Sequence, residues 1–287
     1  MKAKVSHRAS KSSNWDKIKS GAHFLWLLFK KFGEDHGFFL SSGITFNLLI
    51  CFVPLMLLIL ALVGTYLSSD REVLMHLRRS IESAVPTLDP RITKSILAII
   101  RDRKIVGVLG MGGLIWTSTW VFSSLRTALS LILQGEKERG IFQGKAVDLL
   151  MVFLAGLFLW VSMTLTSSIT LLQGYRISPS LGVGVILRFG LKYVLPFFFT
   201  FWMAFFTYKI IPNRKIHFRT ALYAALFTSL LWEVAKQLFG WYVLHLGRFS
   251  ILYGSLSTLA IFFIWIYYSS AILLLGGEVA FYLEQRR

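Results

Sequence analysis

YGSLSTLAIFFIWIYYSSAILLLGGE, residues 253–278, is the stretch of sequence that decides the fold class of this chain. Residues 256–275 carry no charge, and their apolar side chains would surround a helix instead of forming one stripe. About 20 helical residues reach about 30 Å, the thickness of the hydrocarbon core of a bilayer. Trp265, Tyr267 and Tyr268 lie mid-stretch and not at an interface, so we expect them to pack against neighbouring helices. The stretch therefore predicts a transmembrane helix.

The composition of the whole chain also indicates a membrane protein. Its 287 residues are 55% hydrophobic, which is more than one globular core would absorb. The formal net charge is +17 at pH 7, but most Lys and Arg residues flank apolar segments, as membrane topology requires. We therefore expect membrane lipids, and no specific nucleic acid, as partners. The single cysteine, Cys51, excludes an intramolecular disulfide.

The hydropathy pattern divides the chain into a tail, a surface helix and a bundle. Residues 1–13 are polar and basic and predict a disordered cytoplasmic tail. Residues 14–33 predict an amphipathic helix, either lying in the inner membrane surface or packed under the bundle. Residues 34–287 predict an all-α, polytopic membrane helix bundle, with a helical outer connection at 68–104. Its six expected transmembrane helices cover residues 38–67, 105–125, 149–172, 185–211, 220–243 and 254–277.

An even number of spans places both termini on the same side of the membrane. Lys and Arg number 17 in the segments expected on that side and 10 in the opposite loops. This excess predicts cytoplasmic N and C termini in a bacterial inner membrane. The 68–104 connection holds eight of those ten, so we expect its basic helices to lie on outer-leaflet headgroups.

Polar and ionisable residues inside the spans are the candidates for binding a substrate or lipid, because a charge at membrane depth costs at least ~2.5 kcal/mol. Glu233 and Lys236 are three residues apart and can pair on one helix face. Arg188 and Lys192 share a face and carry like charge, so they would attract an anion. The complete set is Arg126, Arg188, Lys192, Glu233, Lys236, Asn47 and Glu278.

A structural role is the alternative for each candidate. Arg126, Arg188 and Lys192 lie near span ends, where long side chains can reach the membrane interface. Asn47 would form a hydrogen bond between helices or line a cavity. Glu278 would follow the last span and cap or anchor it at the inner surface.

Two prolines are candidate hinges. Pro54 interrupts the first expected span and Pro196 the fourth, which are corresponding members of two three-helix halves. Because three is odd, the halves would have inverted orientation, an arrangement found in transporters that bind substrate near interrupted helices.

Two C-terminal runs are the most distinctive part of the sequence: PNRKIHFRTALYAALFTSLLWEVAKQLFGWYV and YGSLSTLAIFFIWIYYSSAILLLGGEV. With FNLLICFVPLMLLIL and TSTWVFSSLRTALS nearer the N-terminus, they resemble the YihY/BrkB family of inner-membrane proteins, formerly called ribonuclease BN. The resemblance covers nearly the whole chain after residue 14, and the chain departs from the family's pattern at Asn47 and Ser130. It implies a polytopic inner-membrane protein, and transport of an envelope lipid has been suggested for relatives.

The old ribonuclease name can be tested on the residues. The six histidines, at positions 7, 23, 36, 76, 217 and 245, form no H-x-H-x-D run, and no P-loop motif occurs. We therefore expect no enzyme, cofactor or metal. The leading hypothesis is a transporter or flippase for an anionic amphiphile such as an envelope lipid. The alternatives are a non-transporting scaffold for envelope biogenesis and, less favoured, a membrane-bound ribonuclease.

Overall fold

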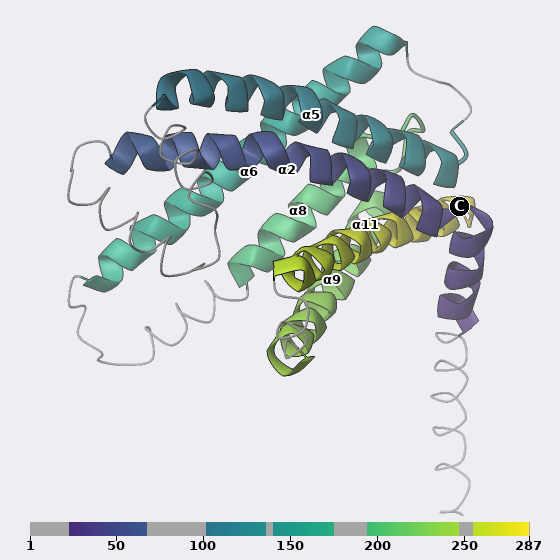
Figure 1. Cartoon of the computed structure of the whole chain (residues 1–287). Coiled ribbons are helices and arrows are strands. Elements are labelled where there is room, and N and C mark those ends of the chain that lie inside the picture. Colours follow the sequence, from purple (N-terminus) through teal and green to yellow (C-terminus); the bar gives the residue numbers. More distant parts are fainter. Residues whose placement is uncertain (1–22, 68–101, 136–139, 175–193, 247–254, 287) are drawn as a thin grey trace, which may run out of the picture.

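The computed structural model is a bundle of long helices (Figure 1). It describes residues 23–67, 102–135, 140–174, 194–246 and 255–286, and within these residues it contains helices and no strand. The amino-terminal helix covers residues 23–34. The six long helices are α2 (Gly37–Leu67), α5 (Arg103–Ile132), α6 (Ile141–Gly174), α8 (Leu195–Ile210), α9 (Phe218–Leu246) and α11 (Ser255–Gln285).

Each long helix overlaps one of the six expected spans, and residues 185–193 of the fourth span lie outside the described residues. Three of them, in α2, α5 and α11, are long and apolar enough to cross a membrane: Gly37–Leu62, Arg103–Ile132 and Leu259–Gln285. A helical membrane protein is therefore confirmed. That all six helices cross the bilayer stays a prediction.

Three helices extend well beyond the expected spans. The helix α6 begins at Ile141, where we began the third span at residue 149, and α5 and α11 end later than expected. We ended the second span at residue 125 and the sixth at residue 277, because a charged residue follows each. Instead α5 continues to Ile132 and α11 to Gln285. The physical reason is that Arg126 and Glu278 find ionic partners inside the protein, so neither charge has to mark the edge of the bundle.

Close contact between α2 and α5 depends on a glycine. A Cβ atom on Gly110 would lie 3.0 Å from the backbone nitrogen of Leu58, so only glycine lets the two backbones approach this closely. Pro54 is buried beside this contact, and α2 continues past it to Leu67.

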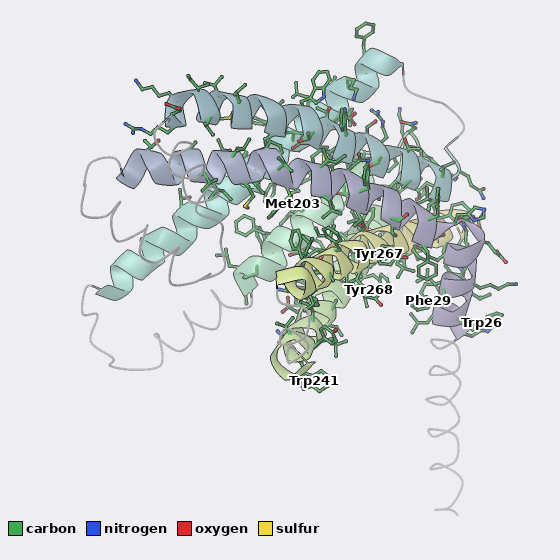
Figure 2. All side chains as sticks on the ribbon, viewed as in Figure 1. Trp26, Phe29, Met203, Trp241, Tyr267 and Tyr268 are labelled. Atoms are coloured by element: carbon green, nitrogen blue, oxygen red, sulfur yellow. The ribbon has the colours of Figure 1, made fainter. Side chains whose placement is uncertain are left out.

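The amino-terminal helix packs on the bundle and also presents an apolar outer face. Leu28 and Phe32 are buried in the core, and the ring of Phe24 meets that of Tyr282 near the end of α11 at 5.0 Å. Trp26 lies exposed on the outer face (Figure 2). The described part of the 14–33 segment therefore packs against the bundle, while residues 14–22 lie outside the described residues.

The start and the end of the described chain lie at the same end of the bundle, which we call the proximal end (Figure 1). Contacts at this end join helices far apart in sequence. The Asn213 amide donates to Ser130 Oγ at 3.3 Å, the Arg214 guanidinium donates to the Leu133 carbonyl, and His217 meets Glu284. Among the described residues, the proximal end thus comprises 23–37, 126–135, 140–148, 208–220 and 278–286.

Of the three mid-span aromatic residues of α11, two contact neighbouring helices and one is exposed. The Trp265 ring packs on Phe239 of α9 with a centroid distance of 4.5 Å, and the Tyr267 hydroxyl donates to the Phe38 carbonyl of α2 at 3.4 Å. Both confirm the expected helix packing. The expectation is wrong for Tyr268, which is 58% exposed because it lies on the face of α11 that turns away from these helices (Figure 2).

Candidate functional site

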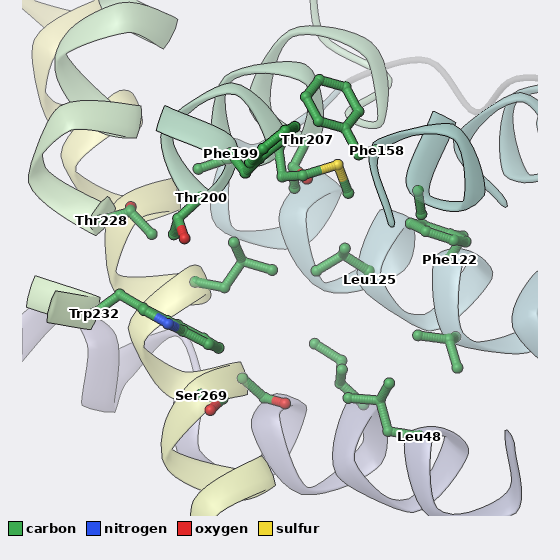
Figure 3. A pocket seen from close by; sticks show the side chains of 17 residues that line it. Leu48, Phe122, Leu125, Phe158, Phe199, Thr200, Thr207, Thr228, Trp232 and Ser269 are labelled. Carbon is green, nitrogen blue, oxygen red and sulfur yellow. The ribbon is translucent and has the colours of Figure 1, made fainter. Parts of the chain in front are cut away.

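A cavity of about 480 Å³ lies in the middle of the bundle and is lined by residues from all six long helices (Figure 3). One wall, from α2, α5 and α6, is entirely apolar. The other, from α8, α9 and α11, also presents hydroxyl groups. The apolar wall comprises Ile44, Leu48, Val121, Phe122, Leu125, Ala155 and Phe158. The hydroxyl groups belong to Thr200, Thr207, Thr228, Ser269 and Ser270. No Lys, Arg, Asp or Glu of the described residues lines this cavity.

The hydroxyl groups differ in whether the protein already provides them with a hydrogen-bond partner. Thr200 donates to the Pro196 carbonyl at 2.9 Å, and Ser270 donates to the Ile266 carbonyl at 3.0 Å. The hydroxyl oxygen of Ser269 is buried and has no hydrogen-bond partner among the described residues. A buried hydroxyl without a partner costs about 1–3 kcal/mol, so Ser269 offers a guest molecule a favourable hydrogen bond.

A buried hydrogen-bond network lies beside the cavity at Thr228. The Tyr208 hydroxyl donates to the Leu273 carbonyl at 2.7 Å, and its oxygen lies 2.7 Å from Thr228 Oγ1, which therefore donates to it. A Cβ atom on Gly276 would lie 1.9 Å from Thr228 Oγ1 and 2.1 Å from the Tyr208 oxygen. The first glycine of the LLLGGE run thus gives α11 its close approach to α8 and α9.

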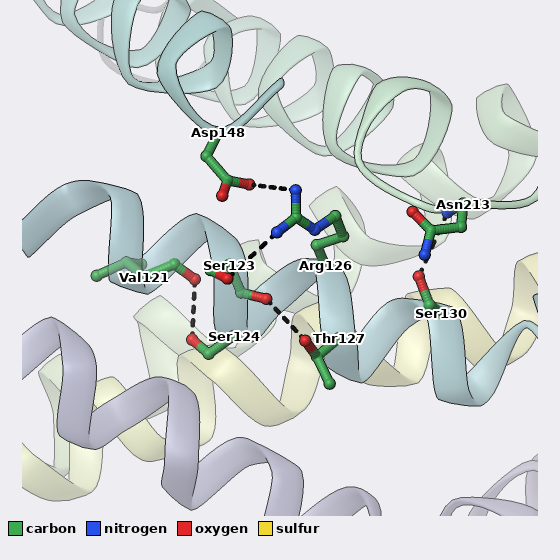
Figure 4. A network of polar contacts seen from close by, with 8 residues as sticks. All are labelled: Val121, Ser123, Ser124, Arg126, Thr127, Ser130, Asp148 and Asn213. Atoms are coloured by element: carbon green, nitrogen blue, oxygen red, sulfur yellow. Dashed lines mark hydrogen bonds and ion pairs between the residues drawn. The ribbon is translucent and has the colours of Figure 1, made fainter. Parts of the chain in front are cut away.

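Arg126 forms a buried ion pair that joins α5 to α6 (Figure 4). Its Nη1 atom lies 3.2 Å from Oδ1 of Asp148, and its Nη2 atom donates to Ser123 Oγ at 3.3 Å. Asp148 is 1% exposed and Arg126 16%. The alternative that Arg126 simply reaches the membrane interface is therefore wrong, because the carboxylate of the neighbouring helix holds it inside the protein.

Glu278 is fully buried and contacts the amino-terminal helix. Its Oε2 atom lies 3.1 Å from the Lys31 ammonium, which also pairs with Asp35. We expected Glu278 beyond the last span, but it lies inside α11, about two turns before the helix ends. Glu278 therefore anchors α11 through an ion pair with the amino-terminal helix. It does not cap α11.

The other expected pair, Glu233 and Lys236, forms on α9. The Lys236 ammonium lies 2.6 Å from Glu233 Oε2, and both side chains are about one-third exposed. Asn47 donates to the Gly43 carbonyl of its own helix at 3.2 Å, instead of to another described helix as we expected. Neither the pair nor Asn47 lines the central cavity.

Of the remaining three candidates, two lie outside the described residues and one lies near the start of a described range. Arg188 and Lys192 lie outside the described residues. Pro196 occupies the first turn of α8, a position that proline fits because the amide there needs no helical partner. The roles of Pro54 and Pro196 as hinges, like the binding roles of all the candidates, stay predictions.

The sequence reasoning missed Asp148, Lys31 and Tyr208. We began the third span at residue 149 and so left Asp148 outside it, although Gly144, Asp148 and Met151 follow the helical spacing of four and three residues. All three are buried on one face of α6, so that spacing was the available signal. Tyr208 carried no such signal, because its partners on α9 and α11 lie 20 and 65 residues further along the chain.

The long apolar helices and the cavity among them define the class of this protein, a helical integral membrane protein. The chain belongs to the family described as Virulence factor BrkB, which it matches over residues 28–287. The expected family is confirmed.

Among its relatives, a UPF0761 membrane protein of Haemophilus influenzae is 24% identical over 92% of this chain and 96% of its own length. UPF0761 membrane proteins of Glaesserella parasuis and Aeromonas salmonicida are 27% and 24% identical, over 71% and 90% of this chain and 71% and 88% of their own lengths. These names indicate a membrane protein and state no reaction. No solved structure matches this chain.

Proposed function

We propose that this protein is a transporter or flippase for an amphiphile such as an envelope lipid, and that the central cavity receives the apolar part of that molecule. One observation carries the proposal: a cavity of about 480 Å³ with an apolar wall facing hydroxyl groups. Small-molecule sites typically measure about 300–1,000 Å³ and combine an apolar lining with a few polar groups.

The two walls suit the two parts of such a molecule. An acyl chain would lie against the side chains of α2, α5 and α6, where Leu48 and Phe122 contribute apolar surface (Figure 3). An ester or hydroxyl group would accept a hydrogen bond from Ser269. Because burying an unpaired charge is costly, an anionic headgroup would remain outside the cavity. Arg188 and Lys192 stay our candidates for contacting it.

The cavity also favours the leading hypothesis over the scaffold. A scaffold requires only a closed and tightly packed bundle, for which an interior space of this size has no use. The ribonuclease hypothesis would require several metal ligands in reach of one another. Within the described residues no group of three or more His, Cys, Asp or Glu residues is placed to hold a metal ion.

The proposed orientation places the proximal end, and with it both termini, in the cytoplasm of a bacterial cell. The support is the excess of Lys and Arg in the segments of this end, since cytoplasmic loops carry more positive charge.

The test is lipid transport in vesicles reconstituted with the full-length protein. Ala155→Trp fills the cavity from α6, and Leu157→Trp places the same side chain two residues further on, at a position 43% exposed on the outside of the bundle. We expect transfer of a fluorescent phosphatidylglycerol between leaflets to be lost in Ala155→Trp and kept in Leu157→Trp. Equal transfer by both variants and wild type, or transfer no faster than in protein-free vesicles, would contradict the proposal.

A further inference from the structure

The Lys31 ammonium sits between two carboxylates at the proximal end. It pairs with Asp35 of its own segment and lies 3.1 Å from Glu278 Oε2 of α11. On a third side it lies 4.1 Å from the centroid of the Phe281 ring, which holds the ammonium by a cation–π contact. These contacts fix one positive charge between two negative charges.

The neighbouring charges do not correct this imbalance within the described residues. Lys30 pairs with Glu34 at 3.6 Å, so these two charges balance each other. The Arg286 guanidinium contacts the hydroxyl and ring of Tyr282. From the turn that follows α5, the adjoining cavity receives only the uncharged side chain of Gln134. With all three groups ionised, Lys31, Asp35 and Glu278 therefore carry a net charge of −1.

Glu278 is the member of this cluster least able to keep a charge. Its side chain is 0% exposed, and its Oε1 atom has no hydrogen-bond partner among the described residues. A buried ion is tolerated only when a counter-charge and hydrogen bonds compensate it, and here one ammonium serves two carboxylates. The surplus charge is removed when one of the carboxylates binds a proton.

A route for the proton is present. A cavity of about 330 Å³ is lined by Glu278 together with Lys31, Asp35 and Tyr282. Polar side chains make up much of its lining, so water can enter it. A proton can pass from that water to a carboxylate oxygen and return to the water when the site opens.

We propose that Glu278 is a proton-binding site, in which its buried carboxylate takes up a proton because the Lys31 ammonium already pairs with Asp35. Binding the proton weakens the attraction between Lys31 and Glu278, and therefore the hold of the amino-terminal helix on α11. The site thus links proton uptake to the position of that helix.

This inference goes beyond the proposed function and does not depend on it. A protein that failed to transport lipid would still show the proton site, and a lipid transporter without the site would show transport alone. If both exist, the proton is the candidate coupling ion for transport.

The test is infrared difference spectroscopy of the purified full-length protein during pH changes, in which a protonated carboxylic acid gives a distinct C=O stretching band. We expect the band in wild type and its loss in both Glu278→Gln and Asp35→Asn, since either variant leaves one carboxylate for one ammonium. Glu34→Gln is the matched control, because it alters a carboxylate on the same cavity that has its own partner. It should keep the band.

Three results would overturn the inference. The first is a wild-type spectrum without the band under conditions where the protein remains folded. The second is a band that survives in Glu278→Gln. The third is loss of the wild-type band on adding sodium at constant pH, which would make the cluster a sodium site. Circular dichroism of each variant establishes that the helices remain intact.

Discussion

Two buried ionic clusters of the proximal end differ in their charge balance. Arg126 and Asp148 provide one positive and one negative charge between α5 and α6. Lys31 joins the amino-terminal helix to α11 but faces two carboxylates, Asp35 and Glu278. The first cluster is complete as an ion pair, whereas the second needs one more positive charge. A balanced pair suits a permanent connection between helices, and an unbalanced cluster suits a site that gains and loses a proton.

The buried charges also have a different role in the bundle from the one that the sequence suggested. The sequence suggested that ionisable residues within the spans line a site for an anion. Among the described candidates, none of Arg126, Glu233, Lys236 and Glu278 lines the central cavity. The cavity presents hydroxyl groups, and the buried charges connect helices at the proximal end. Binding of an amphiphile and binding of a proton are thus assigned to separate places.

The largest expected effect comes from breaking the balanced pair with Asp148→Asn. This change leaves the Arg126 guanidinium, only 16% exposed, without its counter-charge. We expect the free energy of unfolding to fall by about 3 kcal/mol, as for other buried ion pairs that lose one partner. Unfolding of the purified protein by SDS in mixed micelles measures the change.

The matched control for this prediction is Glu233→Gln, which removes one partner of the more exposed pair on α9. It should lower the free energy of unfolding by at most about 1 kcal/mol. Equal effects of the two variants would mean that the Arg126–Asp148 pair does not connect α5 and α6 in the way described.

An intermediate effect is expected from Gly276→Ala, two residues before Glu278. The new methyl group would clash with Thr228 and Tyr208 and push α11 away from α8 and α9. Overpacking of this kind costs about 1–3 kcal/mol, and we expect a loss of about 2 kcal/mol in the same unfolding experiment. Gly156→Ala is the control, since a Cβ atom there meets nothing within 4 Å. A neutral Gly276→Ala would contradict the close approach of α11.

The smallest expected effect comes from Glu278→Gln, although Glu278 is as deeply buried as Asp148. Lys31 keeps Asp35 as its partner and the surplus negative charge disappears. We expect a change of about 1 kcal/mol or less in the free energy of unfolding, the range of a weak ion pair. A loss as large as that in Asp148→Asn would show that Glu278 is a permanent structural partner and would remove the contrast between the two clusters.

The sequence predicted the helices well because their signal is local. An uncharged run as long as residues 256–275 predicts a membrane helix without any knowledge of its neighbours. The same reasoning placed both ends of α2 within one residue of their positions in the structure. It failed at Arg126 and Glu278, where we took a charge as the end of a span.

The charged contacts could not be predicted from the sequence because their partners are distant along the chain. Glu278 meets Lys31 only after the chain has passed through five long helices and most of the sixth. Glu233 and Lys236 were paired correctly because they lie three residues apart on one helix. Tyr268 was predicted wrongly for a related reason. It is exposed, and the residues near it in the sequence do not indicate which face of an all-apolar helix packs against other helices.

The central claim is that the cavity among the six helices holds an amphiphile. Native mass spectrometry of the full-length protein, extracted from its membrane in a mild detergent, tests this claim most directly. We predict a bound lipid on wild type and on Leu157→Trp, and its loss from Ala155→Trp, whose side chain occupies the cavity. Wild-type protein without a bound lipid, or the same lipid occupancy in Ala155→Trp and Leu157→Trp, would contradict the account.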